Sequence, residues 1–104
     1  MASNLPDRAP METIVSCEPA EGGSWHCTVT VGDDPAATTH EVTVDRETLA
    51  DLAPAATPEE LVRASFAFLL EHESRESIMR RFELPIIGRF FADYPDEIRR
   101  RLAG

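Results

Sequence analysis

Two cysteines, Cys17 and Cys27, are the first candidates for chemistry in this chain. They flank residues 18–24, a segment with Pro and a Gly pair that predicts a hairpin loop between two β-rich runs. If the hairpin is symmetric about this loop, the two cysteines lie opposite one another and could form a disulfide or half of a metal site. Two cysteines fall short of a zinc signature, and no secretory signal is expected at the N-terminus. We therefore expect a buried pair of reduced thiols.

The three histidines are the next candidates for chemistry. His40 is predicted on the same sheet face as Cys27, but pairing Cys27 with Val44 leaves His40 four residues away, about 13 Å along the strand. That distance is too long for a shared metal ion. His26 is predicted on the outer face and His72 near a helix end, and neither stands in a nucleophile motif such as G-x-S-x-G. We predict no catalytic, metal-binding or cofactor-binding residue, no cofactor, and a protein that is not an enzyme.

Charge and hydropathy narrow the classes of partner. The chain has 104 residues and a net charge of −9. Residues 1–74 hold 14 acidic residues and 3 arginines, a net charge of −11, whereas residues 75–104 carry a net charge of +2. An acidic protein is repelled by polyphosphate, so we expect its nonspecific affinity for nucleic acid to be weak and do not predict a nucleic-acid partner. No apolar run approaches the roughly 20 residues that span a bilayer, so we expect a cytoplasmic protein without a membrane partner.

The elements that would position these residues begin with three strands. The β-rich runs are Thr13–Cys17, Trp25–Val31 and Thr39–Val44, and the second alternates cleanly between apolar and polar side chains. Short loops between them predict an antiparallel meander with one face exposed to water.

Helical patterns begin at Asp45, which is expected to cap a short helix that Pro54 stops. Residues 57–60, Thr-Pro-Glu-Glu, combine a capping Thr, a Pro at the first helical position and a capping box. They predict a central helix that ends at about Glu73. A third helical stretch is expected over Arg75–Phe82, and two shorter ones after Pro85 and around residues 94–101. The predicted fold is α+β, a three-stranded antiparallel meander followed by a central helix and smaller C-terminal helices, with residues 1–11 as a disordered tail and 12–104 as one domain.

The central helix is apolar on nearly every side. Either the sheet and the C-terminal helices cover all of it, or one face closes a homodimer or binds a partner protein. An arginine cluster at the C-terminus could bind acidic groups, although helix C-termini favour Arg in any case. The residues predicted for a partner interface are Phe66, Phe68, Phe90, Phe91, Arg99, Arg100 and Arg101.

Residues 39–70, from Thr-His-Glu-Val-Thr-Val through the capped helix to Leu70, resemble a ribbon-helix-helix regulator. The resemblance implies a dimer that reads the DNA major groove with outward strand side chains. The matching positions, Thr39, Glu41 and Thr43, include an acid and no base. A DNA-binding transcriptional regulator or antitoxin is the alternative function.

Residues 71–95, with the Thr-Pro-Glu-Glu-Leu lead-in, resemble short uncharacterised bacterial proteins. This resemblance implies a bacterial origin and no particular activity. The function we predict is a non-catalytic protein-interaction or accessory module that binds itself as a homodimer or another protein. The sequence does not identify the partner, the pathway, a small-molecule ligand or the oligomeric state.

Overall fold

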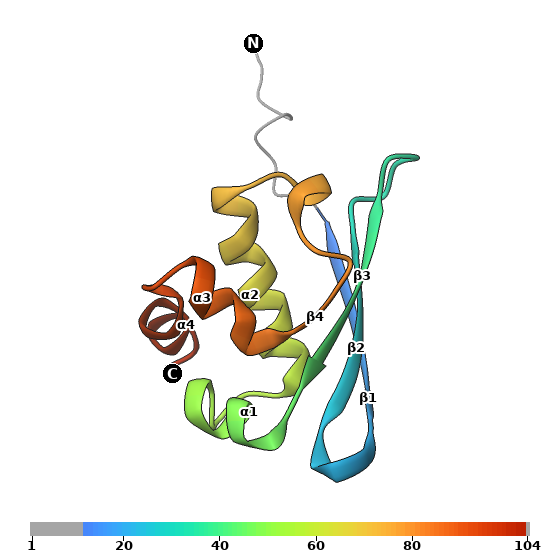
Figure 1. Ribbon diagram of the computed structural model, residues 1–104. Helices are drawn as coiled ribbons and strands as arrows, with labels where there is room; N and C mark the ends of the chain where they lie inside the picture. Colours follow the sequence, from blue (N-terminus) through green and yellow to red (C-terminus); the bar gives the residue numbers. More distant parts are fainter. Residues whose placement is uncertain (1–11, 104) are drawn as a thin grey trace.

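The computed structural model describes residues 12–103, which form a mixed α+β fold with a sheet on one side and helices on the other (Figure 1). The predicted N-terminal tail, residues 1–11, lies outside the described residues. The strands are β1 (Thr13–Pro19), β2 (Trp25–Val31), β3 (Thr38–Val44) and β4 (Arg81–Glu83). The helices are α1 (Arg46–Leu52), α2 (Pro58–His72), α3 (Ile87–Phe90) and α4 (Tyr94–Leu102), and single 3₁₀ turns lie at η3 (Glu21–Gly23), η4 (Arg75–Ser77) and η5 (Leu84–Ile86).

The sheet has the order β1-β2-β3-β4, antiparallel between the first three strands and parallel between β3 and β4. The α+β class is confirmed, but the prediction of a three-stranded antiparallel meander is wrong because β4 joins the sheet. The first hairpin has the predicted register, with Cys17 opposite Cys27. The second is displaced by two residues from the prediction, since Cys27 pairs with Val42. An even displacement keeps each side chain on its predicted face.

The first two helices begin where the sequence predicts. The Asp45 side chain accepts a hydrogen bond from the Thr48 amide at 2.7 Å and caps α1. Thr57 and Glu60 form the reciprocal capping box of α2, with Pro58 at the first helical position. These local bonds satisfy amides that a helix N-terminus leaves without partners.

The predicted helix over Arg75–Phe82 is wrong: one 3₁₀ turn is followed by extended backbone and the strand β4. The extended segment supplies partners to β3, whose second edge would otherwise be unpaired. The Glu41 amide donates to the Arg80 carbonyl at 2.7 Å, and Val42 lies beside Phe82 in the parallel pair. A helix at this position could not make these bonds.

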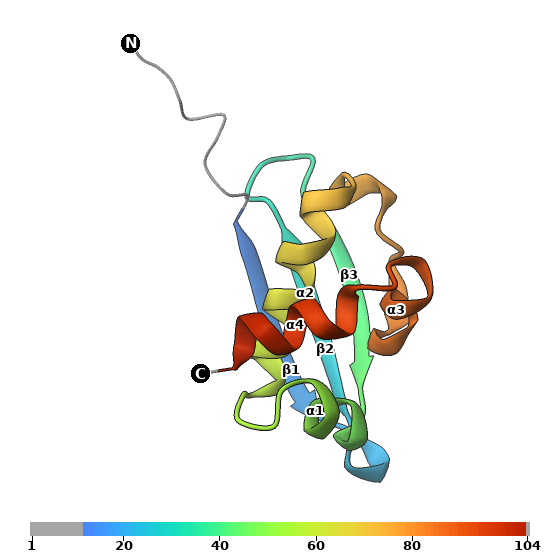
Figure 2. The ribbon, with the colours of Figure 1, turned by 90° about the vertical axis from the view of Figure 1, so that its left-hand side faces the viewer.

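The helices all lie on one face of the sheet (Figures 1 and 2). α2 packs against the sheet, and α4 crosses over α2 on the side away from it (Figure 2). The inner sheet residues and the inner residues of α2 form the core, in which Val29, Val42, Leu61 and Phe66 are fully buried. The other face of the sheet carries mainly polar side chains and no described element covers it.

Candidate functional site

The two cysteines form a disulfide between β1 and β2. The prediction of reduced thiols is therefore wrong. That prediction was based on the expected reducing compartment. In the structure, the register of β1 and β2 places Cys17 opposite Cys27, with their Cα atoms 4.0 Å apart. Disulfides are typical of oxidising compartments. The cytoplasmic location stays a prediction, and within residues 12–103 no helix is long and apolar enough to cross a membrane.

His40 is fully buried and has a structural role. Its Nδ1–H donates to the Met79 carbonyl at 2.8 Å, which leaves Nε2 to accept from the Thr38 hydroxyl at 2.8 Å. Burial lowers the pKa of His40, the bond to Met79 opposes this, and the charge of Arg80 lowers the pKa further. The neutral ring thus joins β3 to the segment before β4 and packs 5.3 Å from the ring of Phe66.

The other two histidines also contact side chains of the same chain. His26 is on the open sheet face, 3.3 Å from the Glu41 carboxylate, which also meets Arg81. His72 packs against the rings of Phe68 and Phe91, with centroids 4.6 and 4.9 Å away. Among residues 12–103 no three His, Cys, Asp or Glu side chains are placed to hold a metal ion.

The arginines predicted for an interface are bound to acidic groups of the same chain. Arg99 makes a bidentate contact with Asp51 at 3.1 Å. Arg100 contacts Glu97 at 2.6 Å, and Arg101 bridges Glu97 and Glu71 at 2.8 Å. The positive charge of these arginines is therefore largely neutralised at the surface. Their ion pairs connect the C-terminal end of α4 to α1 and α2.

Phe66 and Phe68 do not reach the surface, with relative exposures of 0% and 1%. The part of the predicted interface that used these two side chains is corrected, because both belong to the core. Phe66 packs between His40 and Phe82, and Phe68 packs against Phe91 and Tyr94. The C-terminal elements cover the central helix on the side away from the sheet.

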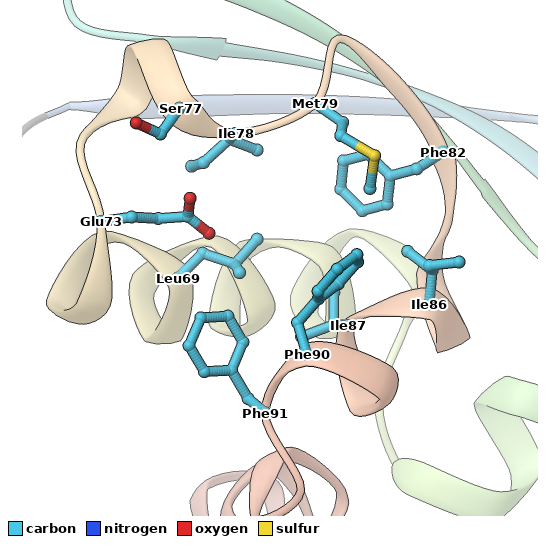
Figure 3. Close-up of a pocket in the computed structure, with 10 residues that line it drawn as sticks. All are labelled: Leu69, Glu73, Ser77, Ile78, Met79, Phe82, Ile86, Ile87, Phe90 and Phe91. Carbon is cyan, nitrogen blue, oxygen red and sulfur yellow. The ribbon is translucent and has the colours of Figure 1, made fainter.

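Phe90 is different, since 66% of it is exposed on α3 beside an open apolar pocket of about 360 Å³. The pocket lies between the end of α2, the extended segment before β4, and α3. The lining residues are Leu69, Glu73, Ser77, Ile78, Met79, Phe82, Ile86, Ile87, Phe90 and Phe91. Figure 3 shows Glu73 at one end of the pocket, Met79, Phe82 and Ile86 at the other, and Phe90 and Phe91 along one side. Met79 is 44% exposed at the rim.

Glu73 is the one acidic residue in this lining. It is half-buried at the C-terminal end of α2, and its carboxylate has no hydrogen bond or ion pair with any residue in 12–103. A second, larger hollow of about 740 Å³ shares Glu73, but charged and hydroxyl side chains such as Arg63, Glu71 and Glu76 make up most of its lining. The smaller pocket is the one lined mainly by apolar side chains.

Phe90 and Phe91 are predicted from the sequence as interface residues, whereas the residues of the opposite wall of the pocket are not. Ile78, Met79 and Phe82 belong to the segment predicted as a helix, so their position could not be inferred. The alternation of Arg81, Phe82 and Glu83 was the one local signal for a strand.

The strand of the ribbon-helix-helix resemblance, β3, pairs with β2 and β4 of its own chain. A ribbon-helix-helix dimer needs this strand to pair with a second copy, so the arrangement does not favour the regulator hypothesis. Comparison of the chain with protein-family models, with curated proteins and with solved structures finds no match.

Proposed function

We propose that this chain is a non-catalytic protein-interaction module and that its contact surface is the apolar pocket between α2 and α3. The observation that carries the proposal is the exposed ring of Phe90 beside a pocket of about 360 Å³ with mostly apolar walls. Aromatic and Met side chains around a pocket are typical of the centre of protein interfaces.

The groups with catalytic potential support the same proposal because they have structural partners. Cys17 and Cys27 are bonded to each other, and His40 is held by Thr38 and Met79. Ser65 and Tyr94 share a buried hydrogen bond of 2.7 Å. Burial raises the pKa of Tyr94 to about 12, and the bond to Ser65 opposes that rise. At neutral pH this phenol stays protonated.

The compartment is part of the proposal. We propose a bacterial cytoplasmic location, as the hydropathy of the sequence predicts. The Cys17–Cys27 disulfide would then have to persist in a compartment where thiols are generally kept reduced. Fractionation of cells that express the chain at native level tests the location. Recovery of the protein mainly outside the cytoplasm would reject it, without bearing on the pocket.

The contact surface is tested by photocrosslinking in cells of the source organism. A photoreactive phenylalanine analogue at position 90 should give a protein adduct of defined mass. The matched control is the same analogue at position 14, because Ile14 is also an exposed apolar side chain, 52% accessible, but lies on β1 away from the pocket. Equal labelling from both positions, or none from position 90, would reject the proposal.

A further inference from the structure

We infer that the occupant of the pocket is a second copy of this chain. In this dimer, the Phe90 ring of each copy enters the other copy's pocket, and Arg89 of each copy pairs with Glu73 of the other. The inference rests on the function proposed above and names its partner.

One patch of the surface presents both a projecting side chain and a pocket. A two-fold dimer uses the same surface on both copies, so that surface must be complementary to itself. Phe90 is 66% exposed and stands at the rim of the pocket that it helps to line. Two copies placed about a two-fold axis would each offer an aromatic ring and each receive one.

Charged side chains of both signs accompany the patch: Glu73 is in the pocket lining, and Arg89, outside the lining, directly precedes Phe90 in α3. Arg89 is exposed next to Phe90, and Glu73 is half-buried at one end of the pocket (Figure 3). Neither side chain has a hydrogen bond or ion pair with another residue in 12–103. In the two-fold arrangement each unpaired carboxylate would meet an unpaired guanidinium, and Arg suits such planar contacts with carboxylates.

The net charge of the whole chain limits where two copies can meet. Two copies that each carry a net charge of −9 repel one another unless they meet where acidic groups are sparse. Most of the net negative charge lies in residues 1–74, whereas residues 75–104 carry a net charge of +2. Eight of the lining residues, from Ser77 to Phe91, belong to that second part. The patch is therefore a place where two acidic copies can approach.

The size of the patch sets the expected strength. A stable interface buries roughly 800 Å² on each partner, and smaller ones form weak or transient complexes. The pocket and its rim form a small contact, so we expect a dimer that dissociates on dilution, with a dissociation constant on the order of micromolar.

Sedimentation equilibrium over a range of protein concentrations tests this dimer. The wild type should be dimeric at high concentration, and Phe90→Ser should be monomeric with an unchanged circular dichroism spectrum. Ile14→Ser, which removes an exposed apolar side chain on the other side of the sheet, should dimerise like the wild type. A monomeric wild type at high concentration would overturn the inference, and so would equal dissociation in both variants.

Charge reversal separates an intermolecular pair from a general effect of charge. Glu73→Arg and Arg89→Glu should each raise the dissociation constant at least about tenfold, because each sets like charges opposite one another. Mixing these two single variants should restore association, since in the mixed dimer Arg at position 73 meets Glu at position 89 and the native pair forms at the other end. If both variants are folded and the mixture stays monomeric, Glu73 and Arg89 do not meet across a dimer.

The crosslinking and sedimentation results together distinguish the interaction module from the more specific dimer. A position-90 adduct with the mass of two chains supports both levels. An adduct of another mass, together with a monomeric wild type, would leave the interaction module standing and reject the second copy. The absence of any adduct from position 90, with a monomeric wild type, would reject both.

Discussion

The helix α2 and the segment that follows it, residues 74–91, both carry phenylalanines that the sequence offers as interface residues, but they differ in burial. Phe66 and Phe68 on α2 are enclosed, whereas Phe90 on α3 is mostly exposed. The difference arises because α2 lies between the sheet and α4, while α3 lies at the outer edge of the helical layer (Figure 2). An apolar helix in the middle of a small domain is thus core, and the aromatic residues free for a partner are those of the outer element.

The sharpest test of this difference in burial is to shorten one side chain in each region. Phe66→Ala should lower the free energy of unfolding by about 3–5 kcal/mol, because it leaves a cavity between His40 and Phe82. Phe90→Ala should change it by less than about 0.5 kcal/mol, as for other surface positions. Urea unfolding of both variants measures the contrast. Similar losses for the two would mean that α3 belongs to the core.

The buried hydrogen bond of α2 gives the next largest effect. Ser65→Ala should lower the free energy of unfolding by about 1–3 kcal/mol, because it leaves the Tyr94 hydroxyl buried without its partner. Ser77→Ala, in the pocket lining, is the exposed counterpart and should be nearly neutral. Thermal unfolding of the two variants compares them, and an equal shift would show that the bond to Tyr94 contributes nothing specific.

The N-cap residues of α2 and η4 should show a smaller difference in their contributions to stability. Thr57→Ala removes the side-chain cap of α2 and should cost about 1 kcal/mol of stability. Ser74→Ala should cost less, since Ser74 makes no capping bond to η4. Chemical unfolding measures both, and a larger loss for Ser74→Ala would contradict the assigned caps.

The pH dependence of stability tests the burial of His40 on β3. The folded state holds the pKa of His40 below its ordinary value, mainly by burial, so the neutral form favours folding. The stability contributed by this group should be complete above the unfolded pKa of about 6.5 and be lost as the pH falls toward the folded pKa. Urea midpoints between pH 5 and 8 measure the slope, and His40→Gln should reduce it. His72→Gln is the matched control on the exposed end of α2, and an equal effect from both would contradict the assignment to His40.

The start of α2 could be predicted from the sequence because its signals are local. Thr57, Pro58 and Glu60 act on each other within one turn, so the helix begins where they stand. The alternation in β2 likewise predicts the buried face correctly, and the loop between β1 and β2 gives the right register. Where the determinants lie within a few residues, the pattern is sufficient.

The rest depended on contacts between distant segments. Residues 81–83 become a strand because β3 has an unpaired edge, and nothing within Arg75–Phe82 reports that edge. Of the candidate site, Phe90 and Phe91 could be named from their apolar type. Glu73, Met79 and Phe82 could not, because the pocket exists only after α2, β4 and α3 meet.

The short parallel pairing of β4 with β3 should make this edge of the sheet open locally. A parallel strand can dock only after the intervening α1 and α2 have brought the chain back, and a pairing this short is held by few backbone bonds. The amides that join β3 and β4 should therefore exchange with deuterium sooner than those of the central hairpin, through local opening rather than global unfolding. Phe82, which lines the pocket, belongs to that strand. Any molecule that fills the pocket should then slow deuterium exchange of the amides along β4. The exchange rate at this edge of the sheet would therefore indicate whether the pocket is occupied.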